Sequence, residues 1–293
     1  MFFERYRRKQ EGAIRFYDLR SGGTRVAVII IFILCIIMVA VSLFPAIWVG
    51  LSGFKDIKEY RREADILPNE LDFERYGKTW DDFKFGQYYV NSFISVAGSV
   101  ICAVFFNGTL AYVLGVLRPR GYKVIFALVM WSLLIPPTTG IVALYVNINR
   151  LGLSQSFLPL WLSMGANAFW VVLFKQFFEK LPKEYIEAAQ LDGCSDFRIF
   201  WNIILPLSRP IIIVVSIFAV TAAWSDFLLP YLVLAGTDKE TVMVRLFEFR
   251  TAIKHTDVDV LRAIVFSIIP PTILFAIFQK QITRGIAAGG IKG

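Results

Sequence analysis

Apolar residues gather along the chain in six long runs, and short charged segments separate these runs. Because a helix rises about 1.5 Å per residue, about 20 apolar residues cross a hydrocarbon core of about 30 Å. The pattern therefore predicts six membrane-spanning helices, at approximately 26–51, 89–117, 122–148, 157–178, 210–234 and 262–282. The first run is too long for the apolar core of a signal peptide and lacks a small-residue cleavage site. We expect it to remain as a helix.

Composition agrees with this pattern. Of the 293 residues, 56% are hydrophobic and 18% are charged, which is more apolar surface than a soluble domain could bury. We therefore predict an all-α integral membrane protein. Its expected parts are an N-terminal tail at 1–25, a first helix with an external loop at 26–88, a five-helix core at 89–283 and a C-terminal tail at 284–293.

The distribution of Lys and Arg predicts which segments face the cytoplasm, because cytoplasmic segments of membrane proteins carry the excess of positive charge. The first 25 residues hold seven Lys or Arg against three acids. With this segment in the cytoplasm, that side carries 18 Lys or Arg and eight acids, whereas the opposite side carries 13 and 14. The remaining acid, Asp226 in the fifth run, completes the net charge of +8. We expect a protein that spans the lipid bilayer of the plasma or inner membrane with both termini in the cytoplasm, and its basic character indicates this topology rather than nucleic-acid binding.

Groups that could carry catalysis or hold a metal are sparse. Cys35 and Cys102 lie inside predicted spans, Cys194 lies in a predicted cytoplasmic loop, and His255 is the single histidine. These residues have no metal-ligand spacing, and the chain has no GxxxxGK[ST] phosphate-binding loop. We therefore expect no enzyme activity, metal or cofactor in this chain. Any ATP that its work requires must be bound by another protein.

The longest internal cytoplasmic segment, 175–209, has the pattern of two short helices joined by a sharp turn. Pro182 suits the first turn of a helix, and Glu187 lies near the positive end of that helix's dipole. Gly193 suits the left-handed position that ends a helix, and Ser195 can cap the next one. A charged segment between two apolar runs is thus predicted to be folded.

The second helix of this segment has apolar residues at i, i+3, i+4 and i+7, which form one face: Phe197, Phe200, Trp201 and Ile204. We expect this face to be buried against the helix bundle or the bilayer surface, and the polar first helix to remain in the cytoplasm. Pro206 and Pro210 are expected to close the second helix.

The stretch "EAAQLDGCSDFRIFWNIILP" resembles the EAA loop of permease subunits of binding-protein-dependent ABC importers. The motif has Glu-Ala-Ala, three residues, Gly, nine residues, Ile, one residue and Leu-Pro. Every fixed position of the motif is occupied, by Glu187, Ala188, Ala189, Gly193, Ile203, Leu205 and Pro206. A lone Glu-Ala-Ala would carry no information, whereas seven fixed positions in a cytoplasmic loop between the fourth and fifth of six spans are specific.

The resemblance covers most of the chain from about residue 89 onward. "IPPTTGIVALYVNINRLGLSQS", "WSDFLLPYLVL" and the ending "AAGGIKG" are similar to the carbohydrate branch, the maltose-type second permease. Ser225 departs from that branch, where a polar amide is commoner, and this departure leaves sugar specificity open.

The resemblance implies the type I ABC importer permease fold and a set of partners. These are a second homologous permease subunit, a cytoplasmic ATPase dimer that binds ATP and Mg, and an extracytoplasmic sugar-binding protein. The EAA loop, at about 179–209, would dock in a cleft of the ATPase. In that role, the small Ala188 and Ala189 would allow close helix approach, and Glu187 would pair with a basic group or cap backbone donors.

A candidate substrate path follows from helix breaks and one intramembrane acid. The tripeptide Ile-Pro-Pro occurs in the third and the sixth runs, and each Pro removes a backbone donor and breaks the hydrogen-bond ladder. At about 1.5 Å per residue, both breaks and the acid lie roughly 10 Å below the outer face. An intramembrane carboxylate normally faces the bundle interior. The candidate residues are Asp226, Trp224, Pro136, Pro137, Pro270 and Pro271.

Structural roles compete with this interpretation. Pro is common in membrane helices, and Asp226 could pair with a neighbouring amide. The intramembrane amides at Asn91, Asn107, Asn147 and Asn167 suit either interhelical hydrogen bonds or sugar hydroxyls.

Two other functions remain open from the sequence. The EAA loop is shared across importers, so the solute could be glycerol phosphate or an amino acid, although the spans hold few Lys or Arg for a phosphate. A non-catalytic membrane assembly protein is the other alternative, and it leaves the EAA spacing unexplained. The mixed segment 235–261 is expected to face outward and contact the binding protein.

Overall fold

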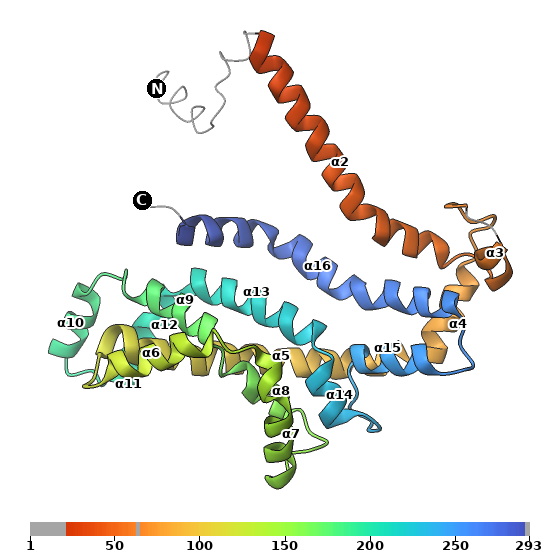
Figure 1. Cartoon of the computed structure of the whole chain (residues 1–293). Helices are drawn as coiled ribbons and strands as arrows, with labels where there is room; N and C mark the ends of the chain where they lie inside the picture. The colour runs from red at the N-terminus through yellow and green to blue at the C-terminus, as the bar shows by residue number, and fades with distance from the viewer. Residues whose placement is uncertain (1–21, 63–64, 291–293) are drawn as a thin grey trace. The chain divides into compact units, whose positions relative to one another are not determined.

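The computed structural model describes residues 22–62 and 65–290, with side chains as far as residue 279 (Figure 1). The chain divides into two compact units, Met1–Asp72 and Phe73–Gly293, which we describe separately. Within the described residues all regular structure is helical, which confirms the predicted all-α class. Most of the segment expected to form an N-terminal tail, 1–25, lies outside the described residues.

The first unit is dominated by one long apolar helix. Helix α2, Gly22–Ser52, has the highest mean hydropathy of the candidate spans, 3.4, and Pro45 lies within it. In the most apolar 18-residue stretch of α2, no residue is buried by other parts of the chain. A helix that is apolar on all sides requires lipid or another protein around it. Helix α3, Ile57–Arg62, follows and is capped by Asp56, whose Oδ1 accepts the N–H groups of Lys58 and Glu59, both at 2.7 Å.

The second unit begins with α4 and contains the remaining helices. Their bounds are α4 Phe73–Phe83, α5 Phe85–Tyr112, η2 Val113–Leu117, α6 Tyr122–Ser132, η3 Pro137–Gly140, α7 Ile141–Arg150, α8 Leu158–Met164, α9 Ala168–Phe178, α10 Glu184–Leu191, α11 Asp196–Ile199, η4 Phe200–Ile204, α12 Leu205–Leu207, α13 Arg209–Ser225, α14 Leu228–Leu234, α15 Val242–Thr251 and α16 Asp257–Gly290.

Helix α5 lies at the centre of this unit, where α8, α9 and α13 pack against it. One face of α5 carries small or polar side chains that are all buried, at intervals of three or four residues: Ser92, Ser95, Ser99, Ala103, Asn107 and Ala111. Small side chains let neighbouring helices approach closely in a membrane. The approach is close at Gly98, where an added Cβ would lie 2.3 Å from the Trp161 ring of α8. The sequence thus places this face so that three helices can surround α5.

Several spans are broken rather than straight. Three described helices could cross a membrane alone, and up to six spans result when each bent pair is counted as one. Helix α6 and the segment 137–150 meet at 97°, as expected for the Ile-Pro-Pro of the third run, and α8 and α9 meet at 47°. The bend in the fourth run was not expected from the sequence.

Asn107 of α5 supplies the hydrogen bonds that the break between α8 and α9 requires. Its Nδ2 donates to the carbonyl of Met164 at 3.0 Å, and its Oδ1 accepts the N–H of Asn167 at 2.8 Å. Backbone groups freed at membrane depth must be satisfied by protein. Asn167 in turn caps α9 by accepting the N–H of Trp170 at 3.2 Å. For the Asn107 side chain the interhelical role is the one observed, whereas the Asn167 side chain caps its own helix.

The expected break at Pro270 and Pro271 was wrong, because α16 continues through both residues. The two prolines remove the donors for the carbonyls of Phe266 and Ser267, four residues earlier. Tyr89 Oη of α5 donates to the Phe266 carbonyl at 2.6 Å, and Trp224 Nε1 of α13 donates to the Ser267 carbonyl at 3.1 Å. These two side chains replace the lost backbone bonds, so the helix has no reason to open.

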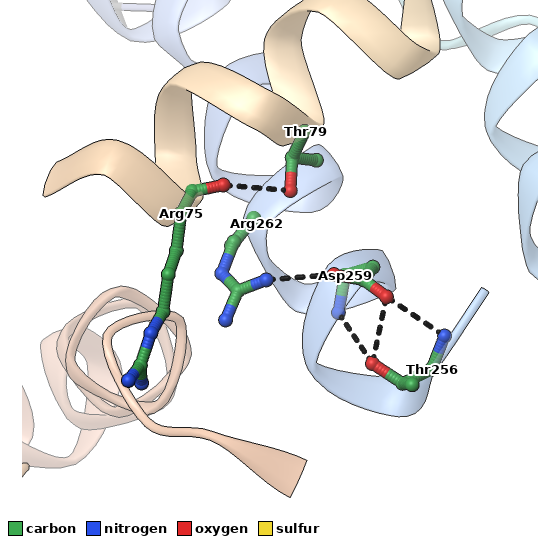
Figure 2. A network of polar contacts seen from close by, with 5 residues as sticks. All are labelled: Arg75, Thr79, Thr256, Asp259 and Arg262. Carbon is green, nitrogen blue, oxygen red and sulfur yellow. Dashed lines mark hydrogen bonds and ion pairs between the residues drawn. The ribbon is translucent and has the colours of Figure 1, made fainter. Parts of the chain in front are cut away.

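The first turn of α16 is stabilised by a network of polar contacts (Figure 2). The N–H of Thr256 donates to Asp259 Oδ2 at 2.9 Å and the Thr256 hydroxyl donates to the same oxygen at 2.7 Å, while the N–H of Asp259 donates to Thr256 Oγ1 at 3.4 Å. This is the reciprocal arrangement of a capping box. Arg262, only 6% exposed, pairs with Asp259 Oδ1 at 2.6 Å. The capping box and this ion pair therefore stabilise the start of the sixth span.

Candidate functional site

The segment predicted to contain two short helices does so. Helix α10 ends at a turn in which Gly193 has φ of 75°, a left-handed conformation that Gly adopts without strain. Ser195 caps α11 by accepting the N–H of Arg198 at 3.4 Å. Both helices lie at the end of the second unit where η2 and α9 end and α6 begins (Figure 1). The local signals in the sequence were sufficient here.

The apolar face of the second helix packs against the helix bundle at two of its four residues. Phe200 and Ile204 are buried, whereas Phe197 and Trp201 are 68% and 44% exposed. After Phe197 the helix continues as a π-helical turn, Phe200–Ile204, in which the N–H of Leu205 donates to the carbonyl of Phe200. Two aromatic side chains are therefore left on the outer surface of the loop.

Pro206 does not close the second helix, contrary to expectation. The helix continues through Pro206 to Leu207 as α12, and the chain then bends by 82° into α13. Pro210 lies in the first turn of α13, where its missing N–H leaves no internal bond unmade. Ile203 and Leu205 are partly buried against the apolar core of the unit.

The loop is anchored to α5 through its second helix. Ile199, Phe200 and Ile204 belong to the buried core that includes Tyr112 of α5. The rings of Tyr112 and Phe200 lie 5.1 Å apart, and Tyr112 Oη donates to the carbonyl of Asp196 at 3.4 Å. A displacement of α11 would thus affect the C-terminal end of α5, where Tyr112 lies.

Helix α10 has an inner and an outer face. Ala189 is buried in the same core, while Glu187 and Ala188 are exposed. Large apolar side chains around them are also exposed: Tyr185 at 55% and Leu191 at 89%. An exposed apolar surface beside charged residues is typical of a site that another protein covers.

A cleft of about 700 Å³ lies beside α10. Its lining combines charged side chains with apolar ones and comes from the ends of α5 and α9 as well as from α10; the charged members are Arg118, Glu179, Lys183, Glu187 and Asp196. Sequence reasoning identified Glu187 but missed Arg118 and Glu179. Their spacing of 61 residues leaves no signal in a single sequence.

The candidate substrate-path residues lie on different helices of the second unit. Trp224 is buried, and its bond to Ser267 places it against the part of α16 that precedes Pro270 and Pro271. Pro137 begins η3, which packs with α7. The fifth run breaks at Asp226, where φ and ψ of −67° and 129° are extended.

Asp226 lies next to the start of α14. Its carboxylate is near the backbone N–H groups of Phe227, Leu228 and Leu229, but α14 has no side-chain hydrogen bond at its N-cap, Phe227. A carboxylate can accept about four hydrogen bonds, so Asp226 has acceptor capacity for a hydroxyl group.

The segment after α14 is ordered and packs on one end of α5. Asn91 Nδ2 donates to the carbonyls of Asp238 at 2.8 Å and Glu240 at 3.0 Å, and Ser92 Oγ accepts the N–H of Val242 at 2.9 Å. The Glu240 carboxylate accepts the N–H of Gly236 at 2.7 Å. Burial raises the pKa of Glu240 above its usual value, and this exceeds the lowering by that hydrogen bond. These hydrogen bonds hold the segment in a defined conformation, unlike a flexible linker.

Metal ligation has no support in the part of the chain that the structure describes. Among those residues, no three His, Cys, Asp or Glu side chains lie close enough together to hold a metal ion.

Comparison with known proteins identifies relatives over most of this chain. Residues 107–288 match the family model described as "Binding-protein-dependent transport system inner membrane component". The chain is 32% identical over 253 residues to the probable ABC transporter permease protein YurM of Bacillus subtilis, covering 85% of this chain and 84% of the relative. It is 30% identical over 261 residues to the diacetylchitobiose uptake system permease protein NgcG of Streptomyces coelicolor, covering 87% and 86%.

A solved structure shares the fold. It belongs to a bacterial ABC transporter involved in the import of the acidic polysaccharide alginate. The TM-score is 0.79 at 23% identity, covering 89% of this chain and 98% of the other. The predicted type I importer permease fold, with up to six spans, is confirmed.

Proposed function

Since this chain belongs to the binding-protein-dependent transport system inner membrane components, we propose that it is the permease subunit of an importer that takes up a sugar or an oligosaccharide. The observation that carries the proposal is the outer face of α10, where exposed Glu187 and Ala188 lie among exposed apolar side chains while Ala189 is anchored in the core. Such a face suits a rigid contact with a second protein that moves α10.

The partners follow from this role. A cytoplasmic ATPase dimer binds ATP and Mg and contacts α10, so this chain itself is not an enzyme and needs no cofactor. A second, homologous permease completes the passage through the membrane. An extracytoplasmic sugar-binding protein delivers the substrate to the segment 235–261, and both termini lie in the cytoplasm.

The carbohydrate assignment is supported by the names of relatives, among them the diacetylchitobiose uptake system permease protein. Within this chain, Asp226 is the proposed acceptor for substrate hydroxyl groups, because its carboxylate retains acceptor capacity at a break in the fifth span. Glycerol phosphate and amino acids are the competing solutes.

The charge-reversing variant Glu187→Lys tests the coupling role. We expect membrane levels of the protein to be unchanged, because no spanning helix is altered, while sugar uptake and co-purification of the ATPase are lost. Asp81→Lys, the same reversal on the exposed surface of α4, serves as the control for co-purification. Normal uptake and normal ATPase content in Glu187→Lys would refute the assignment of α10.

The solute is tested with the complete importer in proteoliposomes. Labelled oligosaccharides, glycerol 3-phosphate and an amino acid mixture are offered with ATP. ATP-dependent accumulation of an oligosaccharide alone supports the proposal, and accumulation of either other solute replaces it.

A further inference from the structure

The cytoplasmic ends of three spans meet at one carboxylate. Glu179, which follows the last residue of α9, accepts two charged hydrogen bonds on the same oxygen. Arg118 Nη2 lies 2.7 Å from Glu179 Oε1, and Lys175 Nζ lies 2.9 Å from it. The Lys175 side chain is only 12% exposed, and that of Glu179 is 29% exposed. A cluster with this degree of burial is screened less by salt than an ion pair in open water.

The backbone around this cluster is shaped to bring its members together. Arg118 follows the π-helical turn η2 and has φ of 49°, which a non-glycine residue seldom adopts. In that conformation its Nε donates to the carbonyl of Gly115 at 2.8 Å. Gly115 also leaves room for the stem of Lys175, because an added Cβ would lie 3.3 Å from Lys175 Cγ.

The third span is included through an aromatic ring. Lys175 Nζ lies 4.4 Å from the centre of the Phe126 ring in α6. The cluster therefore connects η2 at the end of α5, α6 and α9 through side chains of three segments.

The charges of the cluster keep Glu179 ionised. Burial raises the pKa of Glu179, but the hydrogen bonds and positive charges of Lys175 and Arg118 outweigh burial and hold the pKa below its usual value. At neutral pH the carboxylate is thus available to both cations.

The position of the cluster relates it to α10. Four residues separate Glu179 from the first residue of α10, and Glu179, Arg118 and Glu187 line the same cleft. At the other end of the loop, Tyr112 contacts Asp196 and Phe200. Both ends of the loop that contains α10 are thus held by one stretch of chain, 112–118.

We propose that Glu179, held by Arg118 and Lys175, is a positioning residue that transmits movement of α10 to the cytoplasmic ends of α5 and α6. This inference rests on the proposed function, since it assumes that a partner ATPase moves α10. Without the cluster, α10 can move while the ends of α5 and α6 stay behind. ATP is then hydrolysed with less transport.

The test uses the complete importer in proteoliposomes and measures the number of ATP molecules hydrolysed per sugar imported. We expect this ratio to rise about two- to fivefold in Glu179→Gln, the range that a partly exposed ion pair supplies. Arg118→Gln is expected to raise it similarly, and the double variant no further, because both changes break the same pair. Lys180→Gln, which removes an exposed charge beside Glu179, is the matched control and should match the wild type.

The outcomes separate this inference from the proposed function. If the wild-type complex imports no sugar, the proposed function fails. If it imports sugar and both single variants keep the wild-type ratio, only the role of Glu179 is refuted. Additive effects in the double variant also refute it. Should Glu179→Gln fail to assemble, as judged by gel filtration, Arg118→Gln decides alone, because its side chain is 45% exposed and assembly depends on it less.

Discussion

Trp224 Nε1 donates a hydrogen bond to the backbone carbonyl of Ser267 at 3.1 Å, in a buried setting. That carbonyl has no helical donor, because its partner four residues later is Pro271. Trp224 was a candidate substrate residue from the sequence, and its indole N–H already has a partner. We therefore expect Trp224 to affect transport by keeping α16 a continuous helix, and not by binding substrate.

Replacing Trp224 with Phe tests this relationship. The variant keeps an aromatic ring but leaves the Ser267 carbonyl without a donor, which costs about 1–3 kcal/mol. We expect a lower midpoint of thermal unfolding for the purified complex, with sugar affinity unchanged. Trp131→Phe, at a residue 70% exposed in α6, should leave the midpoint as it is. A changed sugar affinity with normal stability would instead place Trp224 in the substrate path.

Replacing Asn107 with Leu should destabilise the bend between α8 and α9. The substitution is close in volume but leaves the carbonyl of Met164 and the N–H of Asn167 unpaired, and each costs about 1–3 kcal/mol. The expected result is a large loss of assembled complex, measured by size-exclusion chromatography in detergent. Asn149→Leu, at an exposed position of α7, is the control. Normal assembly of Asn107→Leu would show that the bend does not depend on this amide.

Asp226 is examined with two substitutions, because it lies at the break between α13 and α14 and can accept hydrogen bonds. Asn keeps a polar side chain of nearly the same size, so Asp226→Asn should assemble normally. If the carboxylate accepts substrate hydroxyls, this variant will change the uptake rate or the sugar preference. Asp226→Leu should lose uptake, because it removes the acceptor. Wild-type uptake kinetics and sugar preference in both variants would remove Asp226 from the substrate path.

The orientation of the chain is tested by cysteine labelling. In a background with Cys35, Cys102 and Cys194 replaced by Ser, Asp238→Cys should react with an impermeant thiol reagent added to intact cells. Asp238 is exposed and follows α14, on the side predicted to face outward. Glu184→Cys, on α10, should react only after permeabilisation. The reverse pattern would invert the topology.

The sequence was informative where the cause of a structure is local. The cap at Ser195 and the turn at Gly193 need only neighbouring residues, and the structure confirms them. The residues at the fixed positions of the EAA motif could also be identified from the sequence. What they do during transport remains a prediction, since their contacts with a partner lie in another chain.

The two Ile-Pro-Pro tripeptides show where sequence reasoning fails. At 135–137 the chain turns by 97°, whereas at 269–271 the same three residues lie within a continuous helix. The difference comes from Tyr89 and Trp224, which bond the freed carbonyls of α16 from 177 and 43 residues away. The break at Gly165–Asn167 depends in the same way on Asn107, 57 to 60 residues earlier. Single-sequence patterns contain no such distant partners.

Each of these distant partners precedes, in the sequence, the segment that it bonds, and this order matters during synthesis. Asn107 is made before α8 and α9, and both Tyr89 and Trp224 are made before α16. The bend between α8 and α9 and the proline-containing part of α16 therefore leave the ribosome when the side chains that will satisfy their backbone are already part of the nascent protein. The last helix to enter the bilayer needs no later-made element to cover its two orphan carbonyls.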